Sequence, residues 1–389
     1  MSAGLAPGID RLGTETAFSV LARAKELERR GRSIIHLEIG EPDFDTPEHI
    51  KAAAAAALAA GHTGYCPSAG IPELRAAAAA YLGASRGLEI DPEAVIVAPG
   101  AKPFLFFGIL AACGPGDRVL YPDPGFPTYE SAIRWTGAEP VPLRLDEARG
   151  FALDLDELAD ALDGGARLVI LNSPNNPTGG VQPADDHPAI AELLAGTDAW
   201  ILSDEVYASF LYEGSFASVT EQAGMLERTI LVDSCSKTFA MTGWRCGFAA
   251  VPEALREPIT RFLVNSVSCV PPFVQLAAVA ALEGPRGEVD AMLAEFAARR
   301  ELVVDGLNRL PGVSCHAPGG AFYAFPNVGG VPVGAEELAA RLLDEAGVAV
   351  LAGTSFGTTA QSHLRLSYAA SRAALAEGLE RMERFLATL

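Results

Sequence analysis

Between residues 94 and 251 the chain alternates short apolar runs with longer segments that mix apolar and polar residues. The runs are rich in Val, Ile and Leu, a pattern that predicts strands buried on both faces of a sheet. They lie at residues 94–98, 118–121, 139–143, 167–171, 200–202, 229–232 and 246–251.

The segments between these runs favour helices. Residues 154–162 and 183–194 have helical periodicity, and Asp154 or Asp156 could cap the first of these helices. The alanine-rich tracts 52–60 and 76–80 also predict helices, because alanine is the best helix former. Strands that alternate with helices predict an α/β fold with a mostly parallel seven-stranded sheet, flanked by helices on both faces.

The pattern changes after about residue 285. A long helix is expected over 288–310, followed by a turn rich in Gly and Pro at 318–320 and a short strand at 321–325. A last helix is expected over 373–389. This second pattern predicts a smaller α/β domain at the C-terminal end of the chain.

Composition and charge exclude several classes of partner. The 389 residues are 49% hydrophobic and 20% charged, as in soluble globular proteins. Asp and Glu number 49 against 29 Lys and Arg, so the net charge is −20. This charge repels nucleic acids and anionic membranes, and we expect neither as a partner.

Cysteine spacing and the N-terminus bear on location. The closest two of the six cysteines, Cys235 and Cys246, are 11 residues apart, so no CxxC zinc or redox pattern exists and no metal site is expected. The first residues do not resemble a signal peptide, and no apolar run approaches the roughly 18 residues that a membrane span needs. We therefore expect a cytoplasmic protein with reduced thiols.

Polar clusters follow three of the predicted strands. Residues 172–179 (NSPNNPTG) follow the strand at 167–171, residues 203–207 (SDEVY) follow that at 200–202, and residues 234–237 (SCSK) follow that at 229–232. Ligands of open parallel sheets bind outside the carboxyl ends of the strands. The three clusters are therefore expected to meet at one binding site.

The residue types in these clusters favour pyridoxal 5′-phosphate. Its aldehyde needs a lysine, its ring nitrogen an acid, its phenolic oxygen hydrogen-bond donors, and its phosphate hydroxyls, an arginine and backbone N–H groups. No GxGxxG after the first strand, P-loop, HExxH or GxSxG motif is present, so nicotinamide, nucleotide-hydrolase, zinc-protease and hydrolase-elbow chemistry have no support.

Motifs along nearly the whole chain resemble one known family. The sequence is similar to the class I/II aminotransferases of fold type I, and the nearest group is the bacterial aspartate aminotransferases. The motifs that carry the resemblance are residues 40–47, 65–75, 172–179, 203–207, 234–245, 319–323 and 365–369. With this resemblance we expect a large domain at 46–285 that binds pyridoxal phosphate, and a small domain formed by 1–45 and 286–389.

The resemblance also implies roles for individual residues near the cofactor. Lys237 matches the lysine that forms the Schiff base and shuttles the proton of the substrate Cα. Asp204 matches the partner of the ring nitrogen, and Asn176 and Tyr207 match the donors to its phenolic oxygen. The remaining cofactor contacts implied are Ala101 and Lys102 through backbone N–H groups, Phe126 through ring stacking, Ser234, Ser236 and Arg245 at the phosphate, and Tyr65 at the phosphate of a neighbouring subunit.

Other matches concern the substrate and the assembly. Arg365 resembles the arginine that grips the substrate α-carboxylate, with Gly40 and Asn176 beside it. Lys102 stands where a lysine can meet the distal carboxylate of aspartate, although it could instead serve only the phosphate end. Phe126 replaces the usual tryptophan, so specificity for dicarboxylates stays open. The role of Tyr65 implies a homodimer.

We thus expect an aminotransferase with a ping-pong mechanism, with glutamate and 2-oxoglutarate as one substrate pair. Two alternatives remain. One is another reaction of the same cofactor, such as β- or γ-elimination or decarboxylation. The other is a pyridoxal-phosphate-dependent regulator, which would need an added DNA-binding module and a basic surface.

Overall fold

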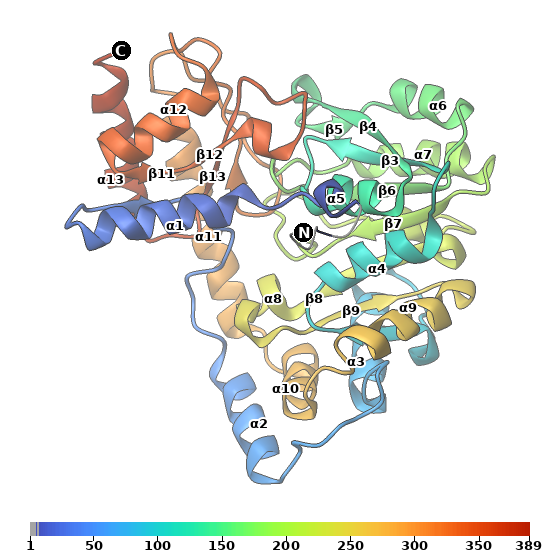
Figure 1. The fold of residues 1–389 in the computed structure, drawn as a ribbon. Helices are drawn as coiled ribbons and strands as arrows, with labels where there is room; N and C mark the ends of the chain where they lie inside the picture. Colours follow the sequence, from blue (N-terminus) through green and yellow to red (C-terminus); the bar gives the residue numbers. More distant parts are fainter. Residues whose placement is uncertain (1–4, 6–7) are drawn as a thin grey trace, which may run out of the picture.

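The computed structural model describes residues 5 and 8–389, and an eight-stranded sheet is the largest sheet in this part of the chain (Figure 1). Its strand order is β2-β9-β8-β7-β6-β3-β4-β5. Strands β9 and β5 run antiparallel to their neighbours, and the other neighbouring pairs are parallel. The bounds are β2 Val95–Ala98, β3 Arg118–Asp123, β4 Glu139–Asp146, β5 Ala152–Leu153, β6 Leu168–Asn172, β7 Trp200–Asp204, β8 Thr229–Ser234 and β9 Gly247–Ala250.

The predicted α/β fold and mostly parallel sheet are confirmed, with one correction to the strand number. The prediction had seven strands and missed β5, whose two residues pair with Leu145 and Asp146 at the end of β4. A strand of two residues is too short to show an alternating pattern, so the sequence carried no signal for it.

Helices cover both faces of this sheet. Successive residues of a strand point to opposite faces. Ile201 of β7 accordingly packs in a core cluster with α6 and α7, and Leu202 packs in another with α4, α5 and α9. Near β2, helices α2, α3 and α10 form a third cluster. The bounds are α2 Glu48–Ala59, α3 Pro72–Arg86, α4 Lys102–Ala112, α5 Thr128–Thr136, α6 Leu155–Asp163, α7 His187–Ala195, α9 Glu253–Ser266 and α10 Pro272–Glu283.

Several predicted helices are confirmed with shifted ends. The alanine-rich tracts lie in α2 and α3, and Asp154 caps α6, where its side chain accepts hydrogen bonds from the backbone N–H groups of Asp156 and Glu157. The long helix begins and ends slightly earlier than expected, as α11 Gly287–Leu307. The last helix is α13 Arg372–Leu386.

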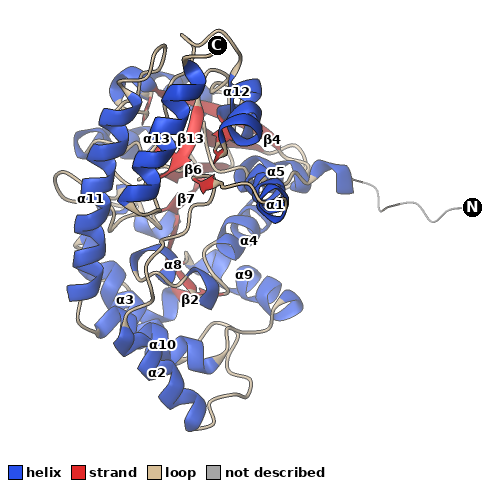
Figure 2. Cartoon of the chain, turned by 90° about the vertical axis from the view of Figure 1, so that its left-hand side faces the viewer, coloured by secondary structure: helices blue, strands red, loops and turns tan. Residues whose placement is uncertain are grey.

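Smaller sheets lie in the C-terminal part. Strands β10 (Tyr323–Ala324), β13 (Leu364–Ser367) and β12 (Leu351–Ala352) form an antiparallel sheet, and β10 lies within the run predicted at 321–325. Strand β1 (Ile35–His36) pairs in parallel with β11 (Val348–Ala349). Figure 2 shows α13 and α12 (Ala335–Arg341) at one end of the molecule and α2 and α10 at the other.

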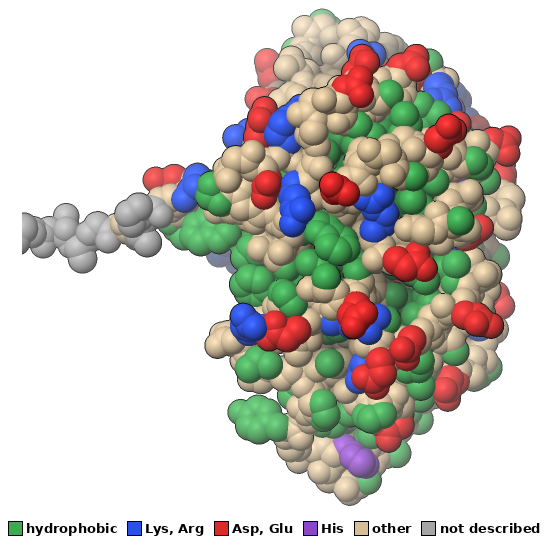
Figure 3. Space-filling model, turned by 90° about the vertical axis from the view of Figure 1, so that its right-hand side faces the viewer, with side chains coloured by type: hydrophobic (Ala, Val, Ile, Leu, Met, Phe, Trp, Pro, Cys, Tyr) green, Lys and Arg blue, Asp and Glu red, His purple; other side chains and the backbone are tan. Residues whose placement is uncertain are grey.

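The N-terminal segment packs on this C-terminal part. Helix α1 (Thr16–Arg29) contributes Ala24 and Leu27 to a cluster with Leu343 and Ala349. The grouping of residues 1–45 with 286–389 into a small domain stays a prediction. Within the described residues, no helix has both the length and the apolar character that a membrane crossing requires. On the face in Figure 3, basic side chains lie among acidic ones.

Candidate active site

The carboxyl ends of β6, β7 and β8 border a cavity of about 550 Å³. Residues from the C-terminal part and from the segment before α1 complete its wall. Every predicted site residue except Tyr65 lines this cavity, which brings together segments far apart in the sequence. These residues are Gly40, Ala101, Lys102, Phe126, Asn176, Asp204, Tyr207, Ser234, Ser236, Lys237, Arg245 and Arg365.

Lys237 lies on the one-turn helix α8 (Cys235–Thr238), directly after β8. Its Nζ donates a hydrogen bond of 2.6 Å to the carbonyl oxygen of Gly40. Burial lowers the pKa of this amine from 10.5 to about 8, because desolvation disfavours the ammonium form. A lysine with this pKa is partly neutral near pH 7 and can act as a nucleophile or a base.

Asp204 is the last residue of β7 and is buried. Its Oδ2 accepts a hydrogen bond of 2.6 Å from the hydroxyl of Tyr129, whereas Oδ1 has no hydrogen-bond partner among the described residues. Burial raises the carboxyl pKa from 3.8 to about 6, and the bond from Tyr129 opposes this rise. A buried carboxylate oxygen without a partner is costly, and a cationic ligand N–H would satisfy it.

Two tyrosine hydroxyls meet beside the lysine. Tyr207 and Tyr323 share a hydrogen bond of 2.7 Å, and Lys237 Nζ lies 5.9 Å from the centroid of the Tyr207 ring. Burial raises the pKa of Tyr207 well above its usual value of 10, so its hydroxyl is protonated and can donate.

One end of the cavity combines groups that can bind an anion. Ser234 caps α8, and its Oγ accepts a hydrogen bond of 3.2 Å from the backbone N–H of Ser236. Ala101 caps α4, and its methyl side chain cannot accept from the N–H groups of the first turn. Gly100, with φ +86°, lies so close to Arg245 that a Cβ would stand 2.3 Å from the guanidinium. Helix N-termini and arginine favour phosphate.

Arg365, on β13, is buried at another wall of the cavity. Its Nη1 donates a hydrogen bond of 3.1 Å to Asn176 Oδ1, and Nη2 donates to the carbonyl oxygen of Glu38. Its Nε has no partner among the described residues. The guanidinium also lies 4.7 Å from the centroid of the Tyr323 ring. This arrangement leaves a fixed planar cation that a carboxylate can approach.

The ammonium group of Lys102 already has a charged partner in the cavity wall. Its ammonium forms an ion pair with Glu15, the residue before α1, and lies 5.3 Å from the centroid of the Phe126 ring. Phe126 contacts Tyr129 edge to face, with 5.9 Å between ring centroids. The sequence prediction did not include Glu15, because its only visible feature was a position next to a helix start.

Tyr65 lies elsewhere, in the loop between α2 and α3, and is 93% exposed. It is not part of the cavity wall of this chain. Its predicted contact with the phosphate of a neighbouring subunit stays a prediction.

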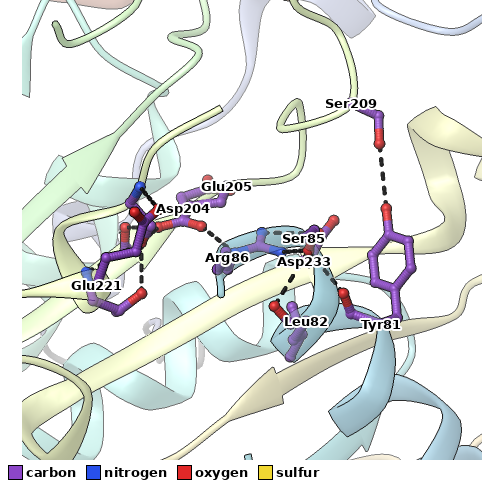
Figure 4. Close-up of polar contacts among 12 residues, drawn as sticks. Tyr81, Leu82, Ser85, Arg86, Asp204, Glu205, Ser209, Glu221 and Asp233 are labelled. Atoms are coloured by element: carbon purple, nitrogen blue, oxygen red, sulfur yellow. Dashed lines mark hydrogen bonds and ion pairs between the residues drawn. The ribbon is translucent and has the colours of Figure 1, made fainter. Parts of the chain in front are cut away.

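A buried ion-pair network joins α3 to the ends of β7 and β8, next in sequence to residues of the cavity wall (Figure 4). Arg86, at the end of α3, donates hydrogen bonds of 2.6 Å to Glu205 Oε2 and 3.1 Å to Asp233 Oδ2. All three side chains are almost completely inaccessible. Glu205 follows Asp204 in the chain and Asp233 precedes Ser234, so the arginine ties together the ends of β7 and β8.

The prediction missed other residues of the wall as well. Tyr323 lies in the motif at 319–323 and Tyr129 lies three residues after Phe126, but the pairing of Tyr129 with Asp204 and of Tyr323 with Tyr207 depends on the tertiary fold. Asn172 begins one of the predicted clusters, and its side chain donates to the carbonyl oxygen of Asp204 at 2.9 Å. The position of Asn172 at the end of a predicted strand could have identified it as a residue of the site.

These features fit pyridoxal phosphate. The unpartnered Asp204 Oδ1 suits the ring N–H, the partly neutral Lys237 amine suits the aldehyde, and the serine and arginine groups suit the phosphate. Among the described residues, no group of three or more His, Cys, Asp or Glu side chains is arranged to hold a metal ion.

Known proteins support this interpretation. Residues 32–382 match the family described as aminotransferase class I and II. A probable aspartate/prephenate aminotransferase of Aquifex aeolicus is 39% identical, with 99% of both chains covered. Aromatic-amino-acid aminotransferase 2 of Thermococcus litoralis is also 39% identical, with 95% of both covered. The aspartate aminotransferase structure from Rhizobium meliloti matches with a TM-score of 0.94, at 36% identity and 99% coverage of both chains.

Proposed function

Because the chain belongs to the class I and II aminotransferases, which use pyridoxal 5′-phosphate, we propose that the protein transfers the amino group of an amino acid to a 2-oxo acid by a ping-pong mechanism, with Lys237 as the residue that bonds the cofactor and moves the substrate proton. Glutamate and 2-oxoglutarate form one expected pair. The observation that carries the proposal is one cavity that holds both the partly neutral amine of Lys237 and the unpartnered oxygen of Asp204.

The residues that would hold the cofactor divide by its parts. Asp204 would bind the ring nitrogen, Asn176 and Tyr207 the phenolic oxygen, and Phe126 the ring face. The phosphate would be bound by Ser234, Ser236, Arg245 and the first turn of α4 at Ala101 and Lys102. When bound, the cofactor withdraws electrons from the substrate Cα and makes its proton acidic.

Lys237 would move that proton. Its Nζ has a pKa of about 8, so roughly a tenth of the amine is neutral at pH 7 and can accept a proton.

Arg365 would orient the amino acid. A substrate carboxylate could take two parallel hydrogen bonds from its guanidinium, with Asn176 and the backbone of Gly40 beside it. Gly40 has to remain small, since a Cβ there would lie 1.9 Å from the hydroxyl of Tyr323. Binding at this point fixes the substrate Cα near Lys237.

The proposal extends to assembly and location. We propose a cytoplasmic homodimer in which Tyr65 reaches the phosphate of the second subunit, because this exposed tyrosine has no role in its own cavity. We also propose residues 46–285 as the large domain, and 1–45 with 286–389 as the small domain.

The test is a set of half-reactions with single amino acids and no acceptor. Transamination predicts loss of the cofactor absorbance with one equivalent of 2-oxo acid and no free ammonia or carbon dioxide. Ammonia release would instead identify elimination, and carbon dioxide would identify decarboxylation. The Lys237→Ala variant is the matched control and should form no 2-oxo acid, because the group that moves the Cα proton is missing.

A further inference from the structure

A carboxylate of the cavity wall lies beside Lys102, the residue expected to meet the distal end of a substrate. Glu15 Oε1 forms an ion pair with Lys102 Nζ, and both residues line the cavity. The Glu15 side chain is 22% exposed and that of Lys102 is 46% exposed. The ion pair is therefore accessible to a ligand, but its two charges already compensate each other.

Other cations of the cavity wall are engaged elsewhere. Arg365 is the proposed anchor of the α-carboxylate, and Lys237 is the reacting amine. Arg245 donates hydrogen bonds to the carbonyl oxygens of Thr242 and Pro99 and belongs to the proposed phosphate site. Of the four Lys and Arg side chains in the described wall, Lys102 is thus the remaining one for a second substrate carboxylate.

A dicarboxylate would have to compete with Glu15 for this lysine. If Glu15 moves away, its ion pair with Lys102 is lost, and if it stays, two carboxylates lie near one ammonium and repel each other. Glu15 also influences the other end of the substrate site: burial lowers the pKa of Arg365, and the negative charge of Glu15 is among the groups that oppose this lowering.

The surroundings of the ion pair are apolar. Phe126 lies beneath the ammonium, Leu105 lies one turn along α4 from Lys102, and Ala17 and Phe18 follow Glu15. Phe18 is 61% exposed and forms part of the cavity wall. A neutral side chain could bury apolar surface against these groups while the ion pair stays intact.

We propose that Glu15 is a specificity-determining residue that neutralises Lys102 and makes the site prefer amino acids with neutral, apolar side chains over aspartate and glutamate. This inference rests on the proposed transamination and on Arg365 as the anchor of the α-carboxylate. Lys102 is then the ion-pair partner of Glu15 and is not free to bind the distal carboxylate of a substrate.

The test is the Glu15→Gln variant of the holoenzyme. Glutamine keeps the size of the side chain and removes its charge, and no helix cap is lost because Glu15 makes no side-chain capping bond. In half-reactions, the specificity constant for aspartate and glutamate should rise about 10-fold or more, while that for leucine and phenylalanine should change less than about 2-fold. Glu26→Gln is the matched control, since it removes a charge from α1 outside the cavity wall.

Binding without reaction supplies an independent readout. Calorimetry with succinate, a dicarboxylate that cannot react, should show about 10-fold tighter binding to Glu15→Gln, and the gain should vanish in the Glu15→Gln/Lys102→Ala double variant. A wild-type preference for aspartate over leucine, or equal succinate affinity in both proteins, would overturn the proposal. If no amino acid reacts with any variant but succinate binding still tightens, the proposed function fails and the assignment of Glu15 stands.

Discussion

Replacing Arg86 by methionine tests whether the buried ion-pair network at the ends of β7 and β8 stabilises the site. The Arg86 side chain has 0% exposure and contacts two carboxylates that are each 2% exposed. Methionine fills much of the same space but leaves both Glu205 and Asp233 without their cation. Removing one partner of a buried ion pair costs about 3–5 kcal/mol, because the remaining charge stays buried and unpaired.

The loss of stability in the Arg86→Met variant should depend on pH. Burial already raises the pKa of Asp233 from 3.8 to about 6 in the folded protein, and Arg86 limits this rise. Without the arginine the folded pKa rises further, whereas the unfolded value stays at about 4. A carboxyl with a raised folded pKa loses stability as the pH rises from the unfolded value through the folded value. The part of the stability difference that comes from Asp233 should therefore be small below about pH 6 and should grow between pH 6 and 8.

Thermal unfolding of the two proteins at pH 5.5 and 8, each with saturating cofactor, measures this effect. For a chain of this length, a loss of about 4 kcal/mol corresponds to a decrease in Tm of about 5 °C. The matched control is Arg86→Lys, which keeps the charge and should lose less. An unchanged Tm at pH 8 would refute the reasoning, and an equal decrease at both pH values would show that ionisation of Asp233 does not contribute to the effect.

Further predictions concern the cavity itself. Lys237→Ala should lose nearly all turnover, and borohydride should no longer fix the cofactor to the chain; fixation to another lysine would contradict the assignment. Asp204→Asn should slow removal of the Cα proton by roughly 100-fold or more with a smaller loss of cofactor affinity, measured by stopped-flow absorbance and equilibrium dialysis. Arg365→Lys should raise KM for amino donors about 10–100-fold, since a bidentate contact is lost, with thermal stability as the control. Tyr65→Phe should weaken cofactor binding about 10-fold only if the tyrosine reaches a second subunit.

The main sheet could be predicted because its strands are buried on both faces. Residues 229–232 and 200–202 form continuous apolar runs, and such runs are characteristic of parallel strands between two layers of helices. The short strands β1 and β11 have two residues each and depend on each other for pairing, so no local pattern marks them. These two strands form because the N-terminal segment packs on the C-terminal part, which the sequence does not show.

Much of the cavity could be predicted for a topological reason. Asp204 and Lys237 follow neighbouring parallel strands, so their positions at one sheet edge are a consequence of strand direction. Arg86 had no such signal, because an arginine that ends an alanine-rich helix before Gly87 is typical of a solvated helix end. Only the tertiary fold places it between two buried carboxylates.

Glu15 shows why substrate preference is harder to predict than chemistry. The groups that would bind the cofactor come from rigid strand ends, whereas Glu15 lies in the segment before α1 and meets Lys102 across 87 residues of sequence. In the sequence, Lys102 is a cation that could meet a distal carboxylate or serve only the phosphate end. With Glu15 beside it, the same cation contributes little net charge to that site. A preference based on one charge can be reversed by one side chain from a distant segment, while the transamination chemistry depends on several groups that would have to change together.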